Sequence, residues 1–158
     1  MTTPVRLWIE TTHHAAFRYG GWAFVREAEG AVSGAAGGER ATTAARIDLM
    51  ALIAALGGLP AGAAVAVRTA SPSLLAAGRL IQTPPAPEDA PTEDLDLWAQ
   101  VLKAAAGRAV SFKSAPRTLQ TPGAFCFAWA EVGQDKAKAA GRFSAAIPKP
   151  NLAKLKLD

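Results

Sequence analysis

One helical stretch decides the fold of this chain: Thr43-Ala44-Ala45-Arg46-Ile47-Asp48-Leu49-Met50-Ala51. Threonine before the first turn is a typical helix N-cap. Apolar residues then recur at helical spacing through Met50 and Ile53. Gly57-Gly58, followed by Pro60, ends the helix near Leu56. A helix at this point separates three strands that precede it from a fourth that follows it.

Three short strands are predicted before this helix. Residues 5–12 mix β-branched and aromatic side chains, residues 22–27 follow Gly20-Gly21, and residues 31–34 follow the turn signal Ala28-Glu29-Gly30. Because few residues join the second strand to the third, we expect these strands to pair antiparallel. Gly37-Gly38 is expected to end this meander.

Strands and helices alternate after the first helix. Residues 63–69 predict a buried strand, and Ser71-Pro72 begins a helix that ends near residue 81. Further helices are expected over residues 93–106 and 127–141, with a fifth strand over residues 109–113. The Pro-rich stretch 82–92 is expected to be a mobile loop. This alternation indicates an α/β sheet whose central strands are parallel.

The composition is that of a globular protein with one domain. The 158 residues are 50% hydrophobic and 19% charged, and their net charge of +4 is compatible with nucleic acid without establishing it. The single cysteine, Cys126, excludes an internal disulfide and a cysteine-based metal cluster. No run reaches the roughly 18 apolar residues of a membrane span, and no secretory signal is visible. We therefore expect a cytoplasmic protein with no membrane partner.

Several local motifs carry a resemblance to a known family. Ile9-Glu10-Thr11-Thr12 ends the first strand, Gly20-Gly21-Trp22 enters the second, and Asp96-Leu97-Trp98 opens a later helix. Together with the stretch from Thr43 to Ala51, they resemble the ribonuclease H family over most of residues 5–142. The resemblance implies an α/β ribonuclease H-like fold with a mixed five-stranded sheet in the order 3-2-1-4-5 and helices on both faces. It places the domain at residues 1–143 and leaves residues 144–158 as a basic C-terminal tail.

The resemblance also implies an active site that is partly lost. In the family, carboxylates hold two Mg²⁺ or Mn²⁺ ions that activate water and stabilise the leaving oxygen. The matching residues are Glu10, Asp48 and Asp135, which are candidate catalytic residues and metal ligands. Ala70 stands where a further carboxylate is expected. Any Mg²⁺ or Mn²⁺ would therefore bind weakly, and an inactive domain would hold none.

The family's contacts to an RNA–DNA hybrid are altered as well. Ala44 and Ala45 stand where the family has two asparagines, and residues 80–102 contain five acidic residues and no Lys or Arg. Such a stretch repels a phosphate backbone. The candidate nucleic-acid contacts that remain are Arg40, Thr43 and Arg46.

Each carboxylate also has a plainer interpretation. Glu10 fits an ordinary strand-end residue, and Asp48 lies in an early helical turn, where the helix dipole favours an anion. Asp135 fits a solvated helix face, and Glu131, one turn earlier, is a rival for the family position.

Three functions remain open. We expect a catalytically impaired or inactive ribonuclease H-like domain that is retained for binding nucleic acid, such as an RNA–DNA hybrid, or a protein. One alternative is a divergent two-metal nuclease that hydrolyses the RNA strand of hybrids. The other is a structural or interaction domain that binds no nucleic acid and contacts a protein through the C-terminal tail or the Pro-rich loop.

Overall fold

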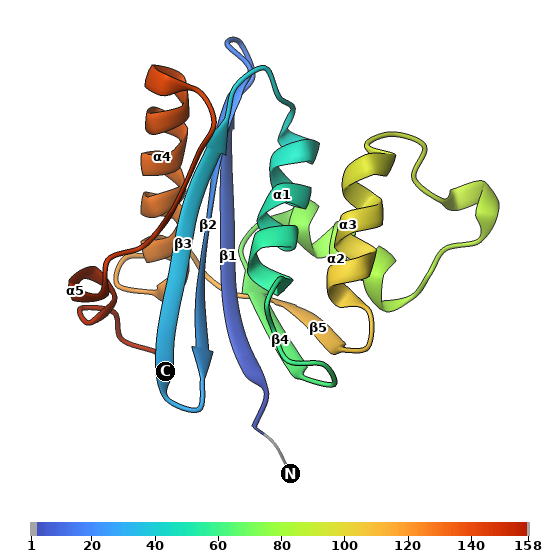
Figure 1. Cartoon of the computed structure of the whole chain (residues 1–158), viewed down its shortest axis with the longest axis horizontal. Helices are drawn as coiled ribbons and strands as arrows, with labels where there is room; N and C mark the ends of the chain where they lie inside the picture. The colour runs from blue at the N-terminus through green and yellow to red at the C-terminus, as the bar shows by residue number, and fades with distance from the viewer. Residues whose placement is uncertain (1–2, 158) are drawn as a thin grey trace.

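A single six-stranded sheet organises the computed structural model, which describes residues 3–157 (Figure 1). Its spatial order is β5-β4-β1-β2-β3-β6. The predicted order of the first five strands is confirmed, and a sixth strand that the sequence analysis did not predict extends the sheet beyond β3. The strands are β1 (Val5–His14), β2 (Tyr19–Ala28), β3 (Ala31–Glu39), β4 (Ala64–Thr69), β5 (Ala109–Ser114) and β6 (Phe143–Ala146).

The strand pairing is mixed, as expected. β2 pairs antiparallel with β1 and β3, whereas β4 pairs parallel with β1 and β5. β3 is longer than predicted, because the turn-like stretch from Gly34 to Gly38 continues as strand to Glu39. Pairing with β2 on one side and β6 on the other holds these small residues extended.

The helices begin at clear sequence signals. Thr43, Ser71 and Thr121 cap the first turns of α1, α2 and α4 through their side-chain oxygens. α4 starts earlier than predicted because Thr121 and Pro122 provide its cap and first residue. No helix within residues 3–157 has the length and apolar character that crossing a membrane requires. The helices are α1 (Ala44–Leu56), α2 (Pro72–Gln82), a short 3₁₀ turn at Pro87–Asp89, α3 (Leu95–Ala105), α4 (Pro122–Ala140) and α5 (Lys149–Leu152).

Different helices cover the two faces of the sheet (Figure 1). α1, α2 and α3 cover one face, and α4 and α5 cover the other over the β1–β3 meander. Alternation along β1 sends Leu7 and Ile9 to the first face and Trp8 to the second. The first cluster is rich in large aliphatic residues, including Leu52, Leu56 and Val67. The second contains many small residues, including Ala23, Ala36 and Ala130.

Glycines let α4 lie directly against the backbone of the sheet. A Cβ atom on Gly133 of α4 would overlap the carbonyl oxygen of Gly37, and a Cβ atom on Gly38 would overlap that of Gly133. Gly21 of β2 approaches Ala130 of α4 equally closely. These contacts fix the height of α4 above the sheet and, with it, the position of the loop that leads into α4.

Residues 143–157 pack against the rest of the domain. β6 pairs antiparallel with β3, and the backbone N–H of Ile147 donates to the carbonyl of Gly34 at 2.9 Å. Ile147 and Leu152 are buried in the cluster beneath α4. The predicted boundary between domain and tail, at residue 143, falls inside β6. Residues 1–2 and 158, which belong to the predicted domain and tail, lie outside the described residues.

Candidate active site

The site lies where the parallel strands β1 and β4 end side by side. Their register places each β1 residue beside the β4 residue 60 positions later, as in the last pair, Trp8 and Arg68. Continuing this register brings Glu10 to Ala70. The resemblance implies a carboxylate at each of these two positions, and the structure places Glu10 and Ala70 side by side.

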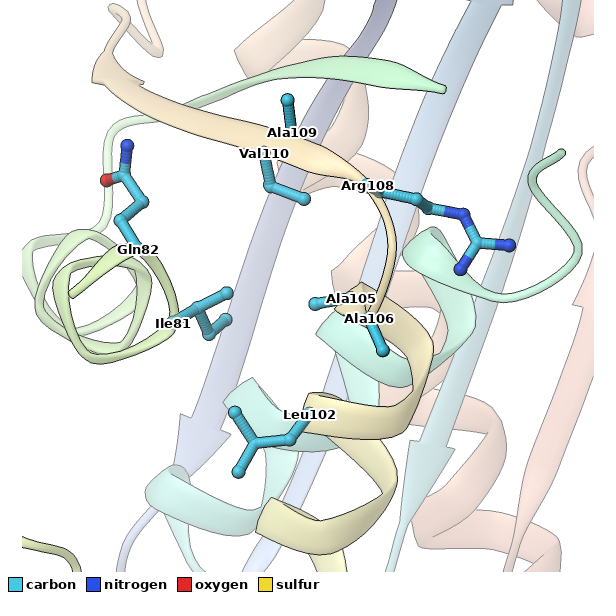
Figure 2. A pocket seen from close by; sticks show the side chains of 8 residues that line it. All are labelled: Ile81, Gln82, Leu102, Ala105, Ala106, Arg108, Ala109 and Val110. Carbon is cyan, nitrogen blue, oxygen red and sulfur yellow. The ribbon is translucent and has the colours of Figure 1, made fainter. Parts of the chain in front are cut away.

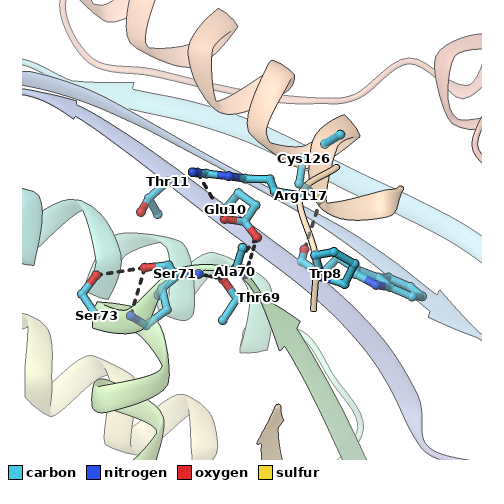
Figure 3. Close-up of polar contacts among 12 residues, drawn as sticks. Trp8, Glu10, Thr11, Thr69, Ala70, Ser71, Ser73, Arg117 and Cys126 are labelled. Carbon is cyan, nitrogen blue, oxygen red and sulfur yellow. Dashed lines mark hydrogen bonds and ion pairs between the residues drawn. The ribbon is translucent and has the colours of Figure 1, made fainter. Parts of the chain in front are cut away.

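Glu10 is buried, with only 1% of its surface exposed. Its Oε2 atom accepts a hydrogen bond from the backbone N–H of Ala70 at 2.8 Å and one from the Thr69 hydroxyl at 3.3 Å (Figure 3). Burial raises the pKa of Glu10, while the Ala70 N–H and the charge of Arg117 act in the opposite direction. The carboxyl group thus retains a proton more readily than an exposed glutamate does.

Arg117 reaches this carboxylate from the loop between β5 and α4. Its Nη1 atom lies 3.8 Å from Oε1 of Glu10 (Figure 3). Its guanidinium lies 4.1 Å from the centre of the Phe127 ring. The stack on Phe127 holds the cation at the carboxylate. Sequence reasoning missed this contact, because no local motif links a loop arginine to a residue 107 positions earlier.

Asp48 lies near Glu10 on the second turn of α1. Its Oδ1 atom accepts a hydrogen bond from the Thr11 hydroxyl at 2.7 Å. Burial raises the pKa of Asp48, while hydrogen bonds from Ser73 and Thr11 and the nearby His13 lower it. The charge of Asp48 in turn contributes to the raised pKa of Glu10. Two of the predicted carboxylates are therefore close enough to interact.

Asp135 and Glu131 lie apart from this pair. Both are exposed on α4. Gly133 and Ala137 are buried against the sheet, and Asp135 is two residues from each, which is about 200° around the helix. Within residues 3–157, no three His, Cys, Asp or Glu side chains come together as a metal site.

Of the three predicted nucleic-acid contacts, Thr43 and Arg46 are engaged within the protein, and Arg40 is exposed. Thr43 accepts the backbone N–H of Arg46 as the cap of α1. Arg46 forms ion pairs at 3.0 Å with Asp94 and 2.9 Å with Asp96, and these bonds raise its pKa further above the ordinary value. Arg46 is thus paired with carboxylates, whereas Arg40 forms no ion pair within residues 3–157.

The donor set around Glu10 does not fit a two-metal centre. Mg²⁺ requires oxygen ligands in near-octahedral geometry. Here Ala70 contributes an N–H donor to Glu10, and Arg117 places a positive charge on the other side of the carboxylate. Asp48 is engaged by Thr11.

A separate pocket offers no better chemistry. It has a volume of 350 Å³ and lies between α2, α3 and the start of β5 (Figure 2). Its lining includes the apolar side chains of Ile81, Leu102 and Val110. Its one charged side chain, Arg108, donates to the backbone carbonyls of Leu59 and Ala104. The pocket lacks an acid, a base and a nucleophile.

Solved ribonuclease H structures share this architecture. The N-terminal RNase H domain of Rv2228c from Mycobacterium tuberculosis has a TM-score of 0.66 at 18% identity, over 88% of this chain and 99% of that one. LC9-RNase H1, a type 1 RNase H with the type 2 active-site motif, has a TM-score of 0.68 at 18% identity, over 92% and 79%. LC11-RNase H1, solved in complex with an RNA/DNA hybrid, has a TM-score of 0.64 at 20% identity, over 85% and 99%.

The likeness rests on structure alone. No protein-family model matches the chain, and no curated protein sequence does so. At 18–20% identity, a shared architecture establishes the fold, while the activity has to be argued from the residues. The strand order, the mixed pairing and the helices on both faces identify this chain as a protein with the ribonuclease H-like fold.

Proposed function

We propose that this chain is a ribonuclease H-like domain that does not cleave RNA–DNA hybrids and that binds nucleic acid. The observation that carries the loss of cleavage is the pairing of Glu10 with the Ala70 N–H on one side and Arg117 on the other. One oxygen of the buried carboxylate thus accepts hydrogen bonds from the protein, and the other faces a cation of the protein, in the place where the family uses metal ions.

Arg117 makes metal binding at Glu10 unfavourable. A guanidinium keeps its charge at every accessible pH. A divalent cation bound at Oε1 of Glu10 would lie close to that charge, which is 3.8 Å from the same oxygen, and like charges at such a distance repel strongly in a partly buried site. This geometry supports a domain in which the positive charge of Arg117 occupies the position beside Glu10 that a metal ion would take.

Two observations support nucleic-acid binding. The chain has a net charge of +4, and the structurally similar LC11-RNase H1 was solved with an RNA/DNA hybrid. A basic domain without base-specific contacts binds with a Kd on the order of 10⁻⁴–10⁻⁶ M at physiological salt, and the affinity falls as salt rises.

The test is cleavage and binding of the same labelled RNA–DNA hybrid. We expect no product in Mg²⁺ or Mn²⁺, and we expect salt-dependent binding by fluorescence anisotropy. The Glu10→Gln variant is the matched control, since it removes the charge but keeps the size of the side chain. Cleavage that disappears in Glu10→Gln would contradict the proposal.

A divergent nuclease is the second candidate, and one observation favours it. Oε1 of Glu10 is buried and accepts no hydrogen bond within residues 3–157, so one carboxylate oxygen is left for another ligand. We would compare Mn²⁺ binding by calorimetry in wild type, Ala70→Asp and Ala70→Asp/Arg117→Ala. If Arg117 excludes the metal, only the double variant gains affinity; Mn²⁺ binding by wild type would favour the nuclease.

A further inference from the structure

The tip of the β1–β2 hairpin lies beside the C-terminal part of α4 (Figure 1). Aromatic and basic side chains of both elements gather there. We define the hairpin patch as Phe17, Arg18, Arg40 and Lys138, which line a hollow of 560 Å³ together with Tyr19 and Ala41. Phe17 is 72% exposed. A phenyl ring this open contributes little to the core, and its face is accessible to a ligand.

Phe17 belongs to a stack of rings. Its plane is tilted by only 7° from that of Tyr19, with 6.3 Å between the ring centres. His14 lies 5.1 Å from both rings, and the ammonium of Lys138 lies 5.7 Å from the centre of the Tyr19 ring. The buried Tyr19 therefore anchors the stack, while Phe17 forms its open end.

The cations of the hairpin patch have no acidic partners. Within residues 3–157, neither Arg18, Arg40 nor Lys138 forms an ion pair. The carboxylate next to Arg40 in the chain, Glu39, is taken up by Arg142 at 3.2 Å. Three positive charges around one open aromatic ring are complementary to a polyanion that carries flat, apolar groups.

The backbone holds this arrangement before any ligand arrives. The N–H of Arg18 donates to the carbonyl of His14 at 2.8 Å, and the N–H of Thr42 donates to the carbonyl of Arg18 at 2.9 Å. Arg18 itself has a φ of 57°, a left-handed conformation that is uncommon for a residue with a side chain. The two hydrogen bonds fix the hairpin tip next to the segment that carries Arg40, which lowers the entropy lost on binding.

We propose that the hairpin patch binds single-stranded nucleic acid, with one unpaired base on Phe17 and its phosphates among Arg18, Arg40 and Lys138. This inference rests on the proposed nucleic-acid function and gives it a location. A base inside a duplex is already stacked on its neighbours, so its face is closed to Phe17. An exposed ring flanked by cations is the arrangement that proteins use for single strands.

The test measures binding of a labelled single-stranded oligonucleotide, and of the matching duplex, at several salt concentrations. We expect Phe17→Ala to weaken single-strand binding about tenfold and Phe17→Tyr to restore it. Lys138→Ala should lower the slope of log K against log salt by about 0.7. Lys136→Ala removes the same charge from the same helix, about 200° around it, and should change binding little.

The possible outcomes distinguish a failure of the hairpin patch from a failure of the nucleic-acid function on which it rests. Salt-dependent binding by wild type that Phe17→Ala and Lys138→Ala leave unchanged would overturn the hairpin patch and keep a nucleic-acid-binding domain. Tighter binding of the duplex than of the single strand would overturn the assignment to unpaired bases. No binding of any nucleic acid by wild type would overturn both proposals.

Discussion

The face of the sheet beneath α1, α2 and α3 is filled by large aliphatic side chains, whereas on the other face glycines bring α4 against the backbone of the strands. On the first face, Leu52, Leu56 and Val67 are fully buried. On the second, Gly37, Gly38 and Gly133 bring helix and strands into direct contact. On the first face, smaller side chains should lower the free energy of unfolding. On the second, larger side chains at the glycines should lower it. The loop that carries Arg117 is positioned by the second.

Removing volume from the aliphatic face should have the largest effect. Leu52→Ala deletes a side chain that is fully buried on α1, so we expect the free energy of unfolding to fall by about 3 kcal/mol. Urea denaturation measures this loss. Leu119→Ala, at a leucine that is 90% exposed, is the control and should change stability by less than about 0.5 kcal/mol.

Adding volume to the glycine face should have the next largest effect. Gly133→Ala places a Cβ atom against the backbone of Gly37, which cannot move aside as a flexible side chain can. We expect a loss of about 2 kcal/mol from overpacking, although alanine is the better helix former. Val132→Ala, at the neighbouring position of α4, is the matched control. A Gly133→Ala variant as stable as wild type would show that α4 does not rest on the backbone.

Glu10 should make stability depend on pH. Burial raises its pKa in the folded state above the unfolded value, so its contribution is fully present below the unfolded pKa and is lost as pH rises through the folded pKa. Glu10→Gln stays neutral, and we expect its free energy of unfolding to match that of wild type at pH 4 and to exceed it at pH 8.

Thermal denaturation over this pH range tests the sign of that effect. Glu27→Gln is a control of opposite sign, because the N–H of Gly30 and Arg6 lower the pKa of Glu27. The stability that Glu27 adds is present above its unfolded pKa and is lost as pH falls through the folded pKa. A difference between Glu10→Gln and wild type that shrinks toward pH 8 would contradict the assignment of Glu10 as a buried acid.

The smallest effect is expected at the ion pairs between α1 and α3. Arg46→Ala removes the contacts with Asp94 and Asp96. Because these groups are partly exposed, we expect a loss of about 0.5 kcal/mol that shrinks in high salt. Denaturation at two salt concentrations measures it. A change this small would mean that apolar packing, and not these ion pairs, holds α3 against α1.

Most of the fold follows from local sequence signals, and most of the site does not. Caps at Thr43 and Ser71 predicted the starts of two helices, and the short connections predicted the antiparallel meander. The strand order was implied by the resemblance to the ribonuclease H family. β6 carries no β-branched residue, and its pairing with β3 depends on contacts far along the chain. Likewise, motifs placed Glu10 and Asp48 near each other, but the approach of Arg117 to Glu10 depends on where α4 rests. The distance between α4 and the sheet is set by glycines in three separate elements, β2, β3 and α4.

The sixth strand gives the folding reaction a late step. Ala36 of β3 pairs with Ala145 of β6, which lies 109 residues later in the chain, whereas β1, β2 and β3 are joined by short connections. Pairings over long separations form slowly, so the meander can assemble while the outer edge of β3 is still unpaired. An unpaired edge accepts a strand from any molecule. When refolding takes place at high concentration, β6 of one molecule can complete the sheet of another, and the product is an exchanged dimer.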